Sequence, residues 1–209
     1  MSKLYVSNKD ETARMFKSDF LEAFSKIHWT VPLFIYVPVI GYLFYLAIFD
    51  YKVPALEIIG LIAAGLFIWT ITEYLLHRFI FHFHTTSNFG KRITFMFHGV
   101  HHDYPNDTKR LVMPPAVSIP LATGFFFLFK VLVGDIFVAP FFIGFIAGYL
   151  FYDISHYAIH HFNMHSKFWL VIKNHHMIHH YQRPELGFGV SSPLWDKILK
   201  TGYDAKKAD

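Results

Sequence analysis

The chain has no cysteine among its 209 residues, and only 16% of its residues are charged. The lack of cysteine excludes disulfide bonds, thiolate catalysis and cysteine-ligated zinc sites. The low charge is unusual for a soluble domain, in which about 25% of residues are charged. The hydrophobic share of 54%, the aromatic share of 20% and the mean hydropathy of +0.33 point the same way. We therefore expect a membrane protein.

No basic run and no recognition motif for nucleic acid accompanies the net charge of +4, so no nucleic-acid partner is expected. The first 26 residues are charged and lack the continuous apolar core of a signal peptide. They predict instead a helix over residues 8–27, because Asn8 and Glu11 have the spacing of a capping box and apolar residues then recur at helical spacing. These apolar residues are Phe16, Phe20, Phe24 and Ile27. The helix would lie either in the membrane surface or against the protein itself.

Four apolar segments follow, and each is close to the length of about 20 residues that a helix needs to cross a bilayer. They span residues 29–49, 56–76, 116–133 and 136–152. Short polar turns join the first segment to the second and the third to the fourth, which predicts two transmembrane hairpins. Only Lys52 and Lys130, of the 19 Lys and Arg residues, lie in or beside the two far turns. This bias places both termini on the cytoplasmic side.

The predicted fold class is therefore all-α, with a single integral membrane domain of four transmembrane helices over residues 1–209. The segments between and after the hairpins form a cytoplasmic, histidine-rich helical cap. This cap comprises residues 77–115 and 153–201, and the polar tail 204–209 is expected to be disordered.

Histidine is the residue type that indicates chemistry, since ten of the fifteen histidines fall into four clusters on the predicted cytoplasmic face. The clusters are His77 and His82; His98, His101 and His102; His156 and His160; and His176, His179 and His180. Imidazole binds iron, zinc, copper and nickel through one ring nitrogen. Random scatter does not produce two copies of H-x-x-H-H, an H-x-x-x-H and an H-x-x-x-x-H on one membrane face. We predict that all ten residues are metal ligands.

Helical geometry divides the ten residues between two ions, because residues four apart share a face and neighbours differ by about 100°. The first ion is assigned His77, His82, His98, His102 and His179. The second ion is assigned His101, His156, His160, His176 and His180. His77 and His82 lie five residues apart, which would splay them by about 140° on a regular helix. We therefore expect the helix to unwind or bulge between them.

The remaining histidines are isolated, and we expect them to be interfacial polar residues. They are His28, His84, His161, His165 and His175. Glu57 and Glu73 lie inside the second predicted span, where a carboxylate either handles protons or, for Glu73, orients the ring of His77 one turn away. Four basic residues near the clusters would contact a lipid head group, anchor the chain at the membrane or bind an electron carrier. They are Lys91, Arg92, Lys109 and Arg110.

Four segments around the histidines resemble the fatty acid hydroxylase superfamily of membrane non-haem diiron oxygenases. They are HRFIFH at 77–82, HGVHHDYPNDTKRLVMPP at 98–115, YDISHYAIHH at 152–161 and HHMIHHYQRPELGFGVSSPLWDKILKT at 175–201. Desaturases, sterol oxidases and carotenoid hydroxylases share the histidine spacing. The D-x-x-R-L-V-x-P-P stretch, together with GFGV and the WDK that follows it, makes the chain most similar to fatty acid 2-hydroxylases that act on sphingolipid acyl chains. The similarity covers about residues 55–201.

The resemblance implies an O2-dependent enzyme with two iron ions, which zinc can replace in purified protein. Its expected reaction is hydroxylation at C2 of a long-chain fatty acyl group in a membrane lipid of the ceramide type. Many eukaryotic relatives begin with a fused b-type cytochrome domain, for which the 28 residues before the first span are too few. We therefore expect a separate electron donor, either a ferredoxin or a b-type cytochrome with its reductase.

Other functions fit parts of the pattern. A diiron desaturase, or a sterol or carotenoid hydroxylase, would share the histidine spacing, and identification of the product would separate them. A b-type haem protein uses paired membrane histidines but leaves H-x-x-H-H unexplained. A metal transporter would place its ligands near the bilayer midplane, whereas these histidines lie at one predicted membrane surface.

Overall fold

The computed structural model describes residues 3–203, and within them every regular element is a helix. This confirms the all-α prediction, while the tail 204–209 lies outside the described residues. In chain order the elements are α1 (Asp19–Phe24), α2 (Val31–Tyr45), η1 (Leu46–Asp50), α3 (Ala55–Leu75), η2 (Leu76–Phe81), α4 (Asn88–Thr94), η3 (Phe95–Gly99), α5 (Val100–Asp103), α6 (Pro115–Val133), α7 (Val138–His161), α8 (Lys167–Tyr181) and α9 (Leu194–Ile198). The η elements are π-helical turns that continue the α-helix before them.

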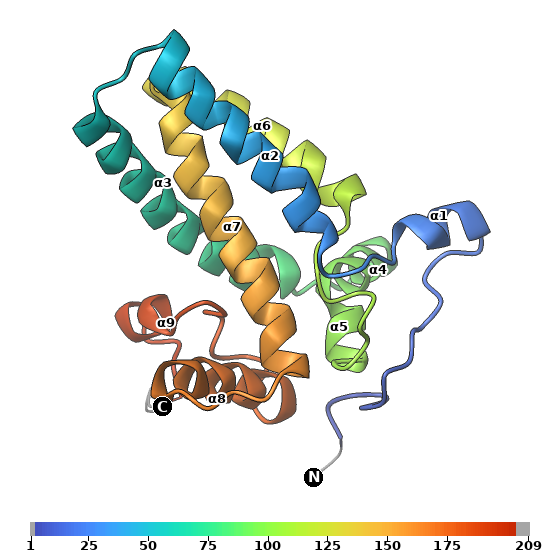
Figure 1. Ribbon diagram of the computed structural model, residues 1–209. Coiled ribbons are helices and arrows are strands. Elements are labelled where there is room, and N and C mark those ends of the chain that lie inside the picture. Colours follow the sequence, from blue (N-terminus) through green and yellow to red (C-terminus); the bar gives the residue numbers. More distant parts are fainter. Residues whose placement is uncertain (1–2, 204–209) are drawn as a thin grey trace.

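Among residues 3–203, four helical segments are long and apolar enough to cross a membrane. They are Val31–Asp50, Ala55–Phe81, Pro115–Val133 and Val138–His161. The first three are largely uncovered, with 11 to 22% of each apolar window buried, whereas α7 is 83% buried. The helix α7 is therefore the centre of the bundle, and it packs mainly against α3 and also against α2 and α6 (Figure 1).

Two glycines allow the close approach of α3 and α7. A Cβ atom on Gly65 would collide with the carbonyl oxygen of Phe141, and one on Gly144 would collide with that of Ile62. The two backbones are therefore in contact along this seam, and a side chain at either position would force them apart.

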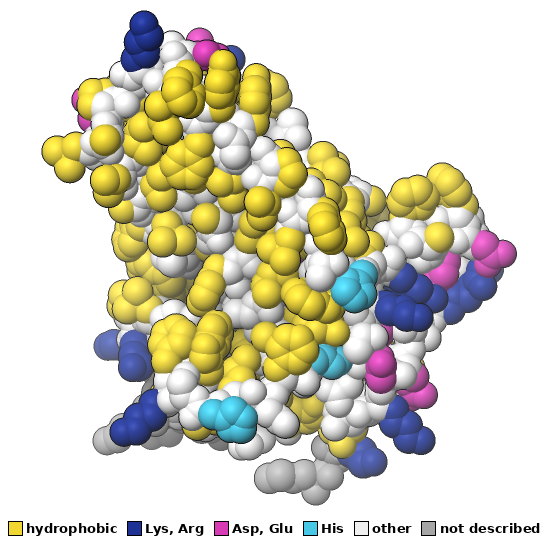
Figure 2. Space-filling model, viewed as in Figure 1, with side chains coloured by type: hydrophobic (Ala, Val, Ile, Leu, Met, Phe, Trp, Pro, Cys, Tyr) yellow, Lys and Arg dark blue, Asp and Glu magenta, His cyan; other side chains and the backbone are white. Residues whose placement is uncertain are grey.

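The outer surface of the bundle is apolar. Phe34, Leu56 and Val131 have exposed fractions of 78%, 81% and 84%. Figure 2 shows hydrophobic side chains over the bundle and charged side chains gathered toward its two ends. An apolar belt of this kind requires a lipid environment, since soluble monomers rarely expose large contiguous apolar patches.

The helix α7 runs to His161, well past residue 152, where the sequence predicted the end of this segment and the start of the cap. Asp153 and His156 are buried on its inner face, and His160 is partly buried. Their helical spacing directs them into the protein interior, so these polar residues do not end the helix. The remaining cap elements α4, α5, α8 and α9 lie around this end of the bundle (Figure 1).

The helix predicted over 8–27 is wrong for most of its length, because only α1 at Asp19–Phe24 is helical. Residues 3–18, which we call the N-terminal strap, cross the cap without regular structure. Backbone amides of Val6 and Ser7 donate to the Asp103 carbonyl at 2.9 and 3.1 Å, and Thr108 donates to Asp10. These partners in the 103–112 segment satisfy polar groups that a helix would otherwise have paired locally.

Candidate metal centre

Ten histidine side chains meet where α3 and α7 reach the cap. His77 comes from η2 and His82 follows it directly, while His98 lies in η3. The helix α5 carries His101 and His102, and α7 carries His156 and His160. The helix α8 provides the other three, His176, His179 and His180. Segments up to about 100 residues apart in the sequence thus converge on one point of the structure.

The imidazole nitrogens form two groups, each able to hold a metal ion, and within each group one nitrogen per residue lies within 4.8 Å of all the others. The first group contains His77, His82, His98, His102 and His179. The second group contains His101, His156, His160, His176 and His180. These are the same five-residue sets into which helical spacing divided the sequence. The groups adjoin, since the rings of His102 and His180 stack with centroids 4.1 Å apart.

A π-helical turn resolves the five-residue spacing of His77 and His82, as the sequence predicted. The segment η2 widens the end of α3, and the amide of His82 donates to the carbonyl of His77 at 3.1 Å. An i to i+5 bond of this kind places residues five apart nearly above one another. The two ring centroids are consequently 4.9 Å apart.

The spacing of the ring nitrogens fits metal coordination. Across the first group the Nε2 atoms of His77 and His98 are 2.9 Å apart, and those of His82 and His179 are 3.0 Å apart. In the second group the Nε2 atoms of His160 and His176 are 3.1 Å apart. Two nitrogens that each lie about 2.0–2.1 Å from one ion, at a right angle, are about 2.9 Å apart.

Buried nitrogens without a protein partner support the same interpretation. Within the described residues, Nε2 of His101, His156 and His180 has no hydrogen-bond partner. A buried polar atom left without a partner costs free energy, and such atoms call for a ligand. The donor set is entirely imidazole, which suits iron or zinc and does not choose between them.

The protonation state of the histidines is also appropriate. Burial lowers the pKa of the seven group members outside the membrane-spanning helices, and at most of them nearby imidazoles lower it further. The pKa falls to about 2 for His82 and to about 4 for His179. It lies well below the usual range for His98, His101, His102, His176 and His180. All seven are therefore neutral at pH 7, which is the form that binds metal.

The five isolated histidines lie outside both groups. His28, His84 and His165 are exposed, and His161 packs on the ring of Tyr157. His175 pairs with Asp196 at 2.9 Å. Of the two carboxylates in the second span, Glu57 is exposed in the first turn of α3. Glu73 is buried and binds backbone amides of Val190 and Ser191 rather than a histidine ring.

A cavity of about 310 Å³ opens beside the histidines. His98, His101 and His156 form part of its wall, and most of the rest is apolar. Its polar lining residues besides these histidines include Ser25, Arg110 and Asp153. An elongated apolar molecule in this cavity would lie against both histidine groups, because His98 belongs to the first and His101 and His156 belong to the second.

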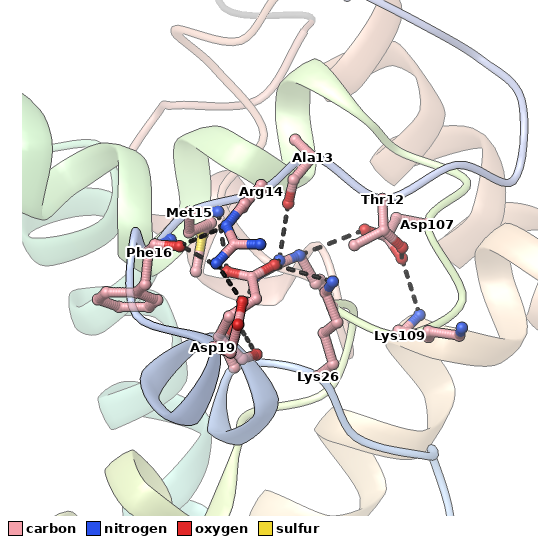
Figure 3. A network of polar contacts seen from close by, with 12 residues as sticks. Thr12, Ala13, Arg14, Met15, Phe16, Asp19, Lys26, Asp107 and Lys109 are labelled. Carbon is pink, nitrogen blue, oxygen red and sulfur yellow. Dashed lines mark hydrogen bonds and ion pairs between the residues drawn. The ribbon is translucent and has the colours of Figure 1, made fainter.

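The N-terminal strap and α1 close one side of this cavity, a feature that the sequence did not predict. They contribute Met15, Phe16, Leu21 and Phe24 to its lining. A polar network holds them in place (Figure 3). Its centre is the Glu22 carboxylate, which accepts from Met15 and Phe16 backbone amides, both at 3.0 Å, and from Arg110 at 2.6 Å.

Arg110 is therefore buried in the protein and does not serve as an exposed head-group contact. The other three basic residues near the histidine clusters are exposed, namely Lys91, Arg92 and Lys109. Burial opposes ionisation of Glu22, but hydrogen bonds from Lys26, Phe16 and Met15 and the Arg110 charge outweigh it. The pKa of Glu22 is lowered to about 2 as a result. Glu22 therefore stays ionised across the physiological pH range.

The comparison with known proteins agrees with this arrangement. The family model described as fatty acid hydroxylase matches residues 62–201. The chain belongs to the fatty acid hydroxylase family. The matched region contains all ten clustered histidines, α3 from Ile62 onward, and the GFGV and WDK sequences.

Several relatives of this family member have curated names. It is 37% identical to fatty acid 2-hydroxylase of Rattus norvegicus over 90% of this chain and 56% of the rat protein. It is 35% identical to a dihydroceramide fatty acyl 2-hydroxylase of Arabidopsis thaliana over 91% of this chain and 80% of the plant protein. A ceramide very long chain fatty acid hydroxylase of Saccharomyces cerevisiae is 37% identical over 90% of this chain and 49% of that protein. The chain thus spans about half the length of the rat and yeast relatives.

A solved structure has the same fold. It is described as full-length scs7p with only the hydroxylase domain visible, and it is 36% identical with a TM-score of 0.83. The alignment covers 90% of this chain and 71% of that one. Together with the four apolar helices, this similarity shows an integral membrane protein of the fatty acid hydroxylase type.

Proposed function

We propose that this chain hydroxylates C2 of a long-chain fatty acyl group, and that this acyl group belongs to a lipid of the ceramide type. The observation that carries the proposal is the pair of five-histidine groups opening onto an apolar cavity. Relatives named for fatty acyl 2-hydroxylation of dihydroceramide and for hydroxylation of ceramide fatty acids support the substrate class.

The ten clustered histidines are the proposed ligands of two iron ions, with zinc as a substitute in purified protein. Bound iron would supply the activation of O2 that attack on an unactivated C–H bond requires. The chain itself fixes the ligands through η2, η3, α5, α7 and α8, where η3 packs against η2 and α5, and α7 packs against α8. Separate electron delivery by a ferredoxin or a b-type cytochrome with its reductase is part of the proposal.

The cavity explains how one carbon would be selected. The carbonyl end of the acyl chain would lie beside His98, His101 and His156, and the tail would run along the apolar lining. The carbon next to the carbonyl then lies nearest both histidine groups, while the methyl end is held away from them. The apolar side chains that the N-terminal strap and α1 contribute to the lining would keep water from this side of the cavity.

The proposed orientation places both termini and the histidines on the cytoplasmic side, with two transmembrane hairpins that turn at 51–54 and 134–137. Figure 1 shows these two turns at the end of the bundle away from α8. The proposed domain organisation is a single membrane domain over the whole chain. Acyl chains could then reach the cavity from the bilayer while polar head groups remain at the surface.

The test is lipid mass spectrometry of a host without 2-hydroxylated sphingolipids, grown under 18O2 with and without the intact protein. We expect one labelled hydroxyl at C2, which is lost when His102 or His180 is replaced by alanine. Replacement of the exposed His28 is the matched control and should leave both the product and two metal ions per chain. An alkene product, a mid-chain or ring hydroxyl, or oxygen from water would contradict the proposal.

A further inference from the structure

The 186–191 loop, which contains GFGV, is held by two buried carboxylates. Amides of Phe188 and Gly189 donate to the two oxygens of Asp196 at 2.9 and 2.7 Å. The next two amides, of Val190 and Ser191, both donate to Oε1 of Glu73 at 2.9 and 2.7 Å. Four consecutive amides are thus fixed from two sides, by α9 and by α3. Asp196 and Glu73 are 0% and 5% exposed, so water does not compete for these bonds.

The carbonyls of the same loop orient two histidines of the first group. Phe188 accepts a hydrogen bond from Nδ1 of His77 at 2.5 Å, and Leu186 accepts one from Nδ1 of His179 at 2.7 Å. A carbonyl oxygen can only accept, so in both rings the proton is on Nδ1 and the lone pair is on Nε2. Those Nε2 atoms are the ones that face His98 and His82.

Within residues 3–203, four of the five members of the second group lack equivalent support from the protein. In the part of the chain that the structure describes, no protein group accepts a hydrogen bond from Nδ1 of four of its five members. These are His156, His160, His176 and His180. The loop therefore acts on one histidine group alone.

We propose that Asp196 and Glu73 are positioning residues for the first histidine group, and that this group holds its metal ion more tightly than the second group does. The inference rests on the proposed metal binding. By fixing the loop, the two carboxylates fix the tautomer and the ring direction of His77 and His179, so that these side chains lose less conformational entropy when an ion binds. Removing partners of this kind lowers metal affinity by about 10- to 100-fold.

The bonding pattern supplies a matched pair of isosteric variants. Each oxygen of Asp196 accepts a hydrogen bond from one loop amide. In Asp196→Asn one of these oxygens becomes an NH2 group, which faces an N–H group and cannot accept its hydrogen bond. At Glu73 both loop amides donate to the same oxygen, so the side-chain oxygen of the glutamine in Glu73→Gln can accept both hydrogen bonds. Asp196→Asn and Glu73→Leu should therefore disturb the loop, and Glu73→Gln should not. Thr201→Val is a milder variant, because it leaves the loop amides bonded to Asp196 and removes only the two bonds of the Thr201 hydroxyl, to Asp196 at 2.7 Å and with Tyr74 at 2.8 Å.

The measurement is the amount of zinc per chain in the purified full-length protein, loaded with Zn²⁺ and challenged with increasing chelator. Wild type and Glu73→Gln should hold two ions and release them in two steps. In Asp196→Asn and Glu73→Leu the tighter ion should be weakened by about 10- to 100-fold, and Thr201→Val should weaken it less. The other ion should be released as in wild type.

A second variant assigns the affected ion. Adding His160→Gln to Asp196→Asn removes a ligand of the second group, so the binding of both ions should be weaker. Adding His82→Gln instead removes a ligand of the first group, so the ion of the second group should be bound as tightly as in Asp196→Asn alone. The inference is overturned if Asp196→Asn and Glu73→Leu keep the wild-type release profile, or if both ions weaken to the same extent. Wild-type protein that binds fewer than two ions would instead overturn the proposed function.

Discussion

Replacing Glu22 with glutamine should release the N-terminal strap and α1 from the cavity. The change keeps the size of the side chain and removes its charge. Arg110 then loses the carboxylate 2.6 Å away, in a place where its side chain is only 2% exposed. Its remaining acidic neighbour is Asp107, at 3.6 Å.

Two estimates give the size of the effect. Removal of one partner from a buried ion pair costs about 3–5 kcal/mol, and the remaining Asp107 favours the lower end. The second estimate comes from the pKa of Glu22, which is lowered from 4.5 to about 2; at about 1.4 kcal/mol for each pKa unit, solvent screening makes the corresponding figure of about 3 kcal/mol an upper bound. A loss of about 3 kcal/mol raises the open population of the strap about 100-fold.

Amide hydrogen exchange measures this opening directly. The amides of Met15 and Phe16 donate to Glu22, so their protection reports on the strap. We expect protection to fall about 100-fold in the variant, while amides inside α7 keep their wild-type exchange rates. The experiment requires the full chain in detergent or nanodiscs.

Asp19→Asn provides the control, since Asp19 is on the same helix and pairs with Arg14 while its side chain is 92% exposed. Exposed pairs contribute about 0–1 kcal/mol, so protection should change by less than about fivefold. If Glu22→Gln changes protection no more than Asp19→Asn does, the ion pair does not hold the strap and the reasoning fails.

Three further outcomes are expected. The protection of the strap amides against hydrogen exchange should be constant above about pH 4.5 and decline as the pH falls toward 2. The reason is that the folded-state pKa of Glu22 lies below its ordinary value, and protonation removes the charge that the strap binds. Protection that declines on the alkaline side would contradict this. Gly144→Ala should lower the thermal midpoint, with a destabilisation of about 1–3 kcal/mol from the clash with α3, whereas Gly60→Ala, with no neighbour within 4 Å, should not. Since the chain has no cysteine, Lys52→Cys offers a single thiol that an impermeant reagent should label from outside, and tags at residues 5 and 205 should both be cytoplasmic; an external tag at residue 205 would refute the orientation.

The features that sequence reasoning predicted well are those with short-range periodicity. The apolar segments specified the four long helices, because helix length against bilayer thickness is a local property. The separation of the histidines within each cluster followed from angles along single helices, so His98 and His102 could be separated from His101 without tertiary information. The bulge between His77 and His82 followed from the same angles.

The features that sequence reasoning missed depend on long-range partners. Residues 8–27 have helical periodicity, but Glu22 meets Arg110 88 positions away and draws the Met15 and Phe16 amides out of a helix. For Glu73 the sequence left open a role in proton handling or in orienting the ring of His77, and the carboxylate binds a loop 117 positions away. No local pattern contains either pairing, so tertiary contacts override the local preference.

The π-helical turn at η2 has a consequence for the comparison of sequences. A π-turn is an α-helix with one residue inserted, so H-x-x-x-x-H across η2 and H-x-x-x-H on a regular helix direct two imidazoles to the same side. The number of residues between His77 and His82 is therefore free to differ by one between related chains without loss of the paired geometry. An alignment that forces equal spacing there would misplace one histidine, whereas a single-residue gap inside the helix would superimpose both.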